Sequence, residues 1–153
     1  SDITSLMEVN LIGVFNAFQS AFKDMRADNW GRMIAIASTA GLKGYSYVSA
    51  YTASKHAVVG LIKSLAIELA GKGITVNSVC PSYIDTPMTD RTIKNITELT
   101  NISKEEAIKE LVKLNPQKRL IKPMEVAKVV SWLCNENSSS INGQNIPIAG
   151  GEI

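Results

Sequence analysis

Segments with helical hydrophobic spacing alternate with short β-branched runs along this chain, and this alternation limits the possible folds more than any other feature. Between residues 5 and 25, apolar side chains recur mostly at three- and four-residue steps, which predicts a long helix. A second such stripe, at 57–69, ends at the glycines of 71–73. The short apolar runs at 32–38 and 74–80 follow these two helices, and each predicts a buried strand.

The same alternation resumes after a long polar segment. Residues 81–122 contain scattered Thr and Asn and one predicted helix at 103–114, which begins with a capping box. An excursion of this length is typical of a lid or binding loop, so we expect a substrate lid here. Pro123 opens a third long helix, and residues 142–151 predict a terminal strand.

This order of elements predicts an α/β fold with a parallel sheet and right-handed crossovers, as one domain that spans residues 1–153. Ligands of such sheets bind beyond the carboxyl ends of the strands. Ser38 and the turn at residues 80–82 fall at two of those ends. Chemistry is therefore expected at these two positions.

Charge and cysteine usage exclude several classes of function. The 16 basic and 14 acidic residues give a net charge of +2 with no basic block, which does not support nucleic-acid binding. Cys80 and Cys134 stand alone, so neither a disulfide framework nor a metal site is expected. The apolar runs are much shorter than the ~20 residues of a membrane-spanning helix. We therefore expect a soluble, cytoplasmic protein without a membrane or metal partner.

Tyr51 and Lys55 form the pattern that points to catalysis. Residues four apart share one face of a helix, so the phenol and the ammonium can reach a common space. A nearby positive charge favours the phenolate form of a tyrosine, and Ser38 is a candidate to hold a substrate oxygen against it. Two residue types at one spacing also occur by chance in many helices. The pair alone is therefore a weak signal.

The neighbouring motifs strengthen that signal. They are "VNLIGVF", "IAIASTAG", "YTASK", "GITVNSVCPSYIDTPM", "KRLIKPMEVA" and "INGQNIPIAGG". In this order and spacing, they resemble the C-terminal part of the short-chain dehydrogenase/reductase family along the whole chain. The resemblance implies the C-terminal part of a doubly wound, Rossmann-like fold. It also implies hydride transfer between NAD or NADP and a carbonyl or secondary-alcohol substrate.

The resemblance assigns catalytic roles to four residues. It implies that Tyr51 is the general acid/base and also contacts the cofactor, and that Lys55 lowers the pKa of Tyr51 and binds the nicotinamide ribose. Ser38 would orient the substrate oxygen, and Asn10 would hold a water in the proton relay.

Cofactor contacts are implied in the segment that follows residue 80. Pro81 would shape the turn beneath the nicotinamide, Ile84 would meet the carboxamide through its backbone, and Thr86 would bind the carboxamide or a phosphate. The family usually has glycine after this proline, whereas this chain has Ser82. We expect the serine side chain to crowd a cofactor that approaches the backbone.

The phosphate-binding half of the family pattern is not found in this sequence. No TGxxxGxG or GxGxxG motif occurs, so roughly the first hundred residues of the fold are expected to be missing, together with the residue that selects NAD or NADP. The strand at 32–38 is then expected to have an unpaired edge. The helices at 5–28 and 49–71 are implied to pack against a partner subunit in a homo-oligomer. A non-catalytic remnant that keeps these helices is the alternative.

The lid region resembles that of 3-hydroxybutyrate dehydrogenases, but the residues that would bind a substrate carboxylate do not match. The corresponding positions here are Ala40, Val48 and Thr92. Ala40 and Val48 suit a neutral substrate such as a 3-oxoacyl thioester, and 3-hydroxybutyrate is the alternative.

Several other conspicuous residues are interpreted structurally. His56 is expected to pack or to lie in an interface, and Arg119 to form an ion pair. Trp132 is predicted to lie in the core, and Gly41 and Gly44 to serve loop geometry.

Overall fold

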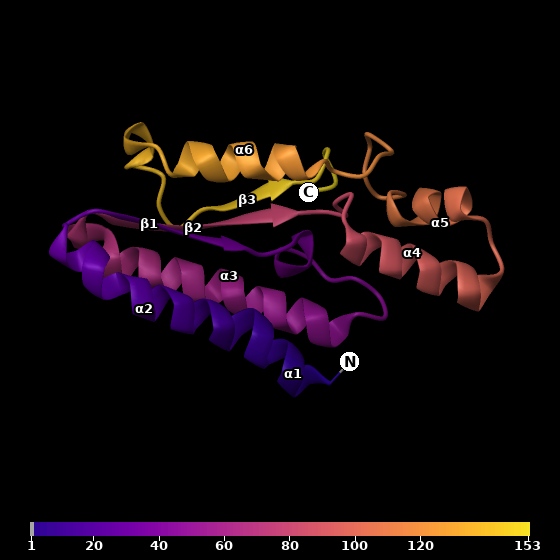
Figure 1. Cartoon of the computed structure of the whole chain (residues 1–153), viewed down its shortest axis with the longest axis horizontal. Coiled ribbons are helices and arrows are strands. Elements are labelled where there is room, and N and C mark those ends of the chain that lie inside the picture. The colour runs from indigo at the N-terminus through magenta and orange to yellow at the C-terminus, as the bar shows by residue number, and fades with distance from the viewer. Residues whose placement is uncertain (1) are drawn as a thin grey trace.

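The computed structural model describes residues 2–153 and contains a three-stranded parallel sheet between two layers of helices (Figure 1). The strands are β1 (Gly31–Ile36), β2 (Ile74–Pro81) and β3 (Asn145–Ile148), in the order β1-β2-β3. Gly31 pairs with Ile74, and Ser78 pairs with Asn145. The predicted α/β fold with a parallel sheet is therefore confirmed.

Helices cover both faces of the sheet and extend past one of its ends. The elements are α1 (Ile3–Met7), the π-helical turn η1 (Glu8–Ile12), α2 (Gly13–Ala27), η2 (Thr39–Gly41), α3 (Ser49–Leu69), η3 (Ala70–Lys72), α4 (Pro87–Thr100), α5 (Lys104–Leu111), α6 (Pro123–Leu133) and η4 (Glu136–Ser138). Figure 1 shows α2 and α3 on one side of the sheet and α6 on the other. In the same view, α4 and α5 lie beyond the carboxyl ends of the strands.

The core is built around β2, all of whose residues are buried. Val76 packs with Val58 and Ile62 of α3 in one apolar cluster. Val79 packs with Leu133 of α6 in a second cluster. Alternate residues of a strand point to opposite faces, so one strand serves both clusters.

Gly73 ends the short helix η3 that follows α3, within residues 71–73, where the sequence predicts the helix to end. It has a φ of 65°, in the left-handed region, and a Cβ on it would lie 2.1 Å from the carbonyl oxygen of Asn29. Only glycine permits both the conformation and this approach. The turn into β2 depends on this residue.

Three sequence-based predictions need correction. The polar segment 81–122 contains a second helix, α4, which the sequence did not predict. Trp132 was predicted to be in the core but is 51% exposed, because the buried stripe of α6 runs through Val126 and Leu133. The first helix is not uniform, since η1 interrupts it at residues 8–12.

Two surfaces of the described residues have little covering. The sheet order leaves β1 paired on one side only, as predicted for this strand, and Ile36 at its end is 49% exposed. None of the residues of α1, η1 or α2 is buried. Both surfaces are formed by the first elements of the chain, within residues 3–36.

Other structural predictions have clear outcomes. Arg119 forms the predicted ion pair, with N to O distances of 2.7 and 2.8 Å to Glu125. This pairing, together with the Lys122 N–H, lowers the pKa of Glu125 to about 2. The capping box of Ser103 and Glu106 is present at α5. Among residues 2–153, no helix has the length and apolar character needed to cross a bilayer.

Candidate active site

Ser38 lies immediately beyond β1 and is nearly buried, with 8% of its surface exposed. Its hydroxyl oxygen accepts a hydrogen bond of 3.1 Å from the backbone N–H of Ala40 and so caps the short helix η2. A hydroxyl carries one donor and two acceptor lone pairs. The hydroxyl hydrogen of Ser38 is therefore available to a ligand oxygen.

The η2 turn is pressed against α3 at a glycine. A Cβ on Gly41 would lie 2.8 Å from the carbonyl oxygen of Lys55 and 3.0 Å from the side chain of Val59. This backbone-to-backbone approach fixes the end of β1, and with it Ser38, against the helix that carries Tyr51. Around Gly44, by contrast, a Cβ would meet nothing within 4 Å.

Tyr51 and Lys55 lie in the first turns of α3. The Lys55 ammonium is 5.7 Å from the centroid of the Tyr51 ring and donates a hydrogen bond of 3.2 Å to the carbonyl oxygen of Ile36. Burial lowers the pKa of Lys55, because desolvation disfavours the charged form. The structure thus brings the tyrosine, the lysine and the end of β1 together.

Asn10 is tied to this helix through a buried serine. Its side-chain amide donates a 3.0 Å hydrogen bond to the hydroxyl of Ser54, which in turn donates to the carbonyl oxygen of Tyr51 at 2.8 Å. Asn10 lies in the π-helical turn η1, and single π turns often occur at functional sites. The chain of two bonds holds η1 against the turn of α3 that bears Tyr51.

Cys80 lies beneath the site, fully buried in β2. Burial raises the pKa of its thiol, while the Ser78 hydroxyl, the Ser38 backbone N–H and the Lys55 charge oppose that rise. The thiol lies 3.5 Å from the Ser78 hydroxyl.

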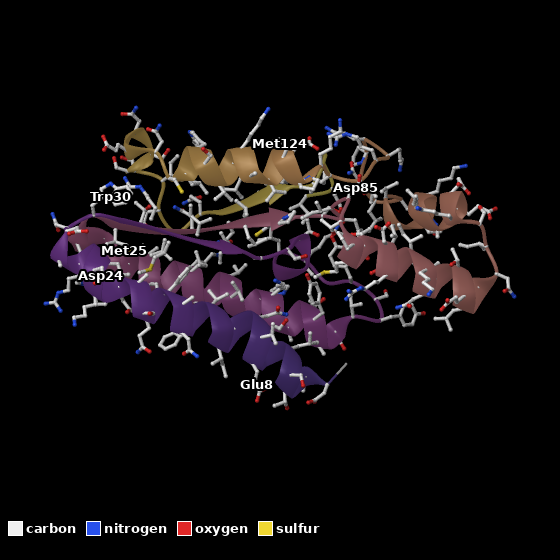
Figure 2. The ribbon with its side chains drawn as sticks, in the orientation of Figure 1. Glu8, Asp24, Met25, Trp30, Asp85 and Met124 are labelled. Carbon is white, nitrogen blue, oxygen red and sulfur yellow. The ribbon has the colours of Figure 1, made fainter. Side chains whose placement is uncertain are left out.

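The turn that follows β2 is held by a single parallel bridge between Ile84 and Ile121. The backbone N–H of Ile121 donates to Tyr83, and the N–H of Asp85 donates to Ile121, both at 2.9 Å. In a parallel bridge these bonds flank the central residue, so the N–H of Ile84 points away from Ile121 and pairs with no other group of residues 2–153. Figure 2 shows Asp85 where the chain passes from β2 towards α4.

Thr86 completes this turn at the start of α4. It is the N-cap residue, yet its hydroxyl makes no capping bond and instead donates weakly, at 3.4 Å, to the carbonyl oxygen of Ile84. The Ile84 N–H and the Thr86 hydroxyl, both predicted to meet a carboxamide, thus lie in the same turn. Their role stays a prediction.

The remaining predicted residues are dispersed around the site. Ala40 is buried in η2, and Val48 is 42% exposed at the N-cap of α3. Thr92 lies on α4 and bonds back to the carbonyl oxygen of Met88. His56 is exposed, so it does not pack in this chain. Within residues 2–153, no group of three acidic, histidine or cysteine side chains is arranged to hold a metal ion.

Sequence reasoning missed three residues of this region. Ser54 is fully buried and links Asn10 to Tyr51. Burial raises the pKa of Tyr83, and the Glu152 carboxylate raises it further. Glu152 receives the hydroxyl of Ser82 at 2.6 Å. Only the position of Tyr83 between Pro81 and Ile84 was a signal in the sequence.

Comparisons with known proteins match this chain over nearly its whole length. A family model described as enoyl-(acyl carrier protein) reductase matches residues 1–152. The chain is 36% identical to D-beta-hydroxybutyrate dehydrogenase of Rhizobium meliloti and 38% identical to a 3-oxoacyl-[acyl-carrier-protein] reductase of Mycobacterium bovis. Both matches cover 95% of this chain, but only 57% and 55% of the respective relatives. The chain therefore spans little more than half the length of these proteins.

A solved structure also matches this chain over most of its length. The structure of an actinorhodin polyketide ketoreductase with NADPH superposes with a TM-score of 0.87 at 37% identity. The match covers 94% of this chain and 56% of the ketoreductase.

The close contact at Gly41 generates a prediction. We expect Gly41→Ala to lower the free energy of unfolding by about 1–3 kcal/mol, because the added methyl group must displace η2 from α3. Gly44→Ala is the matched control and should change it by less than about 0.5 kcal/mol. Denaturant unfolding of the full-length protein measures both. Equal effects of the two variants would show that the Gly41 contact is not a constraint.

Proposed function

The chain belongs to the short-chain dehydrogenase/reductase family, and we propose that its site interconverts a carbonyl group and a secondary alcohol, with NAD or NADP as the hydride carrier. The observation that carries the proposal is the convergence of Ser38, Tyr51 and Lys55 at the carboxyl end of β1. Ligands of parallel sheets bind at this end.

Tyr51 is assigned as the general acid and base. In reduction its hydroxyl gives a proton to the substrate oxygen, and in oxidation its phenolate removes the alcohol proton. The Ser38 hydroxyl donates a hydrogen bond to the same oxygen and orients it. Lys55 supplies the positive charge that favours the phenolate.

The proton that Tyr51 uses must be exchanged with solvent. Lys55 makes one hydrogen bond, to Ile36, although an ammonium has three N–H donors, so it retains donors for a ribose hydroxyl or a water. Asn10, held by Ser54, is assigned to position a water for this relay.

The described residues fit the nicotinamide end of a dinucleotide. A bound nicotinamide would supply or accept the hydride at the substrate carbon. The N–H of Ile84 and the hydroxyl of Thr86 are assigned to its carboxamide, and Pro81 shapes the turn below. A relative in this family, the actinorhodin ketoreductase, is solved with NADPH, which supports the assignment.

We propose a neutral 3-oxoacyl or 3-hydroxyacyl thioester as the substrate. Ala40 and Val48 offer no cation to a carboxylate, and helices α4 and α5 of segment 81–122 would act as the lid above the acyl chain. The similarity to a 3-oxoacyl-[acyl-carrier-protein] reductase supports this choice. The similarity to D-beta-hydroxybutyrate dehydrogenase supports 3-hydroxybutyrate as the second candidate.

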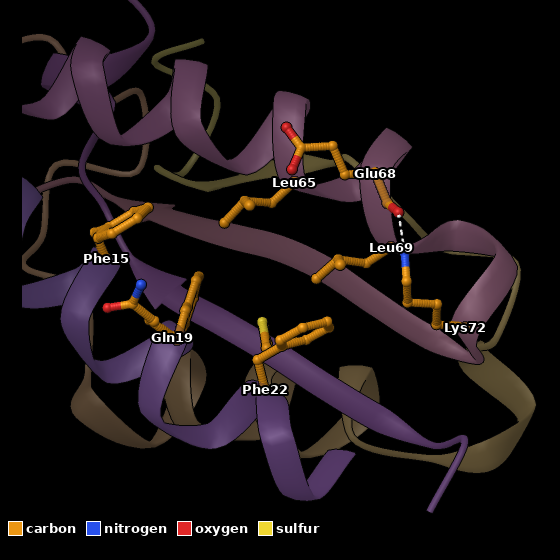
Figure 3. A pocket seen from close by; sticks show the side chains of 9 residues that line it. Phe15, Gln19, Phe22, Leu65, Glu68, Leu69 and Lys72 are labelled. Atoms are coloured by element: carbon orange, nitrogen blue, oxygen red, sulfur yellow. Dashed lines mark hydrogen bonds between the residues drawn. The ribbon is translucent and has the colours of Figure 1, made fainter. Parts of the chain in front are cut away.

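A second copy of the protein is proposed to pack on α2 and α3. A groove of 320 Å³ lies between these helices, and Figure 3 shows Phe15 and Phe22 of α2 facing Leu65 and Leu69 of α3 across it. Phe15 is 43% exposed, and the neighbouring Ile12 is 48% exposed. Contiguous apolar surface of this kind is typical of subunit interfaces.

The role of Tyr51 is tested by Tyr51→Phe in the full-length protein. We expect kcat to fall by about 10²–10⁴-fold, because the ring is kept and only the proton-transferring hydroxyl is lost. Tyr47→Phe is the control, since Tyr47 is fully exposed. Fluorescence titration with NADH and NADPH should show that both variants still bind cofactor. Retained turnover in Tyr51→Phe would exclude the proposed role.

The substrate class is tested by comparing acetoacetyl thioester with free acetoacetate. We expect kcat/KM to be at least about tenfold higher for the thioester, because a carboxylate without a partner is costly to desolvate. Equal turnover of the free acid would favour the 3-hydroxybutyrate alternative.

The proposed interface is tested by Phe15→Asp. A buried carboxylate should weaken self-association by at least about tenfold, as sedimentation velocity would detect. Leu99→Asp, at a residue that is 85% exposed on α4, is the control and should leave association unchanged. An unaltered oligomer in Phe15→Asp would place the interface elsewhere.

A further inference from the structure

Glu152 is almost buried, with 4% of its side chain exposed, and it lies close to the candidate active site. Its carboxylate pairs with the Lys43 ammonium at 3.0 Å and accepts the Ser82 hydroxyl at 2.6 Å. It also forms a short hydrogen bond with the Tyr45 hydroxyl. A buried carboxylate with this many donors is held in one orientation.

The hydroxyl protons can be assigned by counting. The Tyr45 oxygen lies within hydrogen-bond distance of both Glu152 and Thr39, at 2.8 Å from the latter, but it has one proton. An ionised carboxylate can only accept, so Tyr45 donates to Glu152, and the Thr39 hydroxyl donates to Tyr45. Together the hydrogen bonds and the Lys43 charge outweigh burial and hold the pKa of Glu152 below its usual range.

These partners come from segments that follow all three strands. Lys43 and Tyr45 follow β1, Ser82 follows β2, and Glu152 follows β3. The Glu152 side chain therefore connects the segments that follow all three strands. Ligands of parallel sheets bind beyond these strand ends.

Two of these segments contain the groups that must face each other in the reaction. Ser38 precedes the segment of Lys43 and Tyr45, and Ile84 lies two residues after Ser82. The Ser38 hydroxyl is assigned to orient the substrate, and the Ile84 backbone to meet the nicotinamide. The distance between them depends on how these two segments are held relative to each other. Apart from Glu152, no side chain of residues 2–153 forms hydrogen bonds to both of these segments.

We propose that Glu152 is a positioning residue. It holds the turn at 81–84 at a fixed position relative to the segment at 39–45, and so sets the distance between nicotinamide and substrate. This inference rests on the proposed oxidoreductase function. It also accounts for Ser82, where the family usually has glycine. The side chain is drawn towards Glu152 and anchors the turn.

The test uses Glu152→Gln in the full-length protein. The amide keeps the size but loses the charge that holds Lys43, and because its NH2 group cannot accept, it loses the bond from either Ser82 or Tyr45. Glu136→Gln is the matched control, because it removes the same charge at η4, at the opposite end of the sheet. Ser82→Gly removes only the link to the turn and keeps the other contacts of Glu152.

Three measurements separate positioning from a general loss of structure. They are the NADH or NADPH dissociation constant by fluorescence, kcat and KM, and the primary isotope effect with a cofactor deuterated at the transferred position. For Glu152→Gln we expect a dissociation constant raised about tenfold, kcat/KM lowered by about 10- to 100-fold and a larger isotope effect, since misplacement slows hydride transfer. Ser82→Gly should change all three in the same direction by less. The double variant should bind cofactor no more weakly than Glu152→Gln.

The contrary outcomes are distinct. If wild-type protein turns over substrate and Glu152→Gln leaves affinity and isotope effect unchanged, the positioning role is wrong. The same holds if activity falls only in proportion to the folded fraction seen in thermal unfolding. If wild-type protein has no oxidoreductase activity, the proposed function fails, and the role of Glu152 fails with it.

Discussion

Burial of β2 on every side is the constraint on which the rest of the structure depends. Helices α3 and α6 cover its faces, and β1 and β3 pair with its edges. Most buried polar side chains find partners within the protein, although the hydroxyl of Thr75 in β2 has none among residues 2–153. Asn77 finds its partners by donating to the carbonyl oxygen of Ile141 at 2.7 Å and accepting the N–H of Gln144 at 2.9 Å. These bonds fix the return of the chain into β3, and the carboxyl ends of the three strands are thereby aligned.

The candidate site follows from this alignment together with small backbone contacts. Alignment places Ser38, Ser82 and Glu152 at one end of the sheet, while α3 brings Tyr51 and Lys55 to the same end. The depth at which α3 sits is set where Gly41 meets the backbone of Lys55 and the side chain of Val59. Catalytic geometry therefore depends on residues that carry no chemistry of their own.

Local pattern was enough to predict α3, β2 and the Tyr51–Lys55 pair, because each depends on spacing within one element. It failed for α4, where Thr89 occupies a buried position that an apolar residue usually marks, and where threonines lower helix propensity. It failed for Trp132, which lies one residue before Leu133 and is therefore turned about 100° away from it around the helix. Glu152 was beyond local reasoning, since its partners lie 70 to 109 residues away in sequence.

The charges around the site bear on which substrates it can select. Lys43 lies in the segment that follows β1, and its side chain is 33% exposed. Its ammonium is paired with Glu152, and a cation whose charge is already compensated attracts a substrate carboxylate weakly. Lys55 donates to the carbonyl oxygen of Ile36 and lies over the Tyr51 ring. Under the proposed function, a carboxylate in this site would have to compete with Glu152 for Lys43, whereas the neutral thioester that we propose would not.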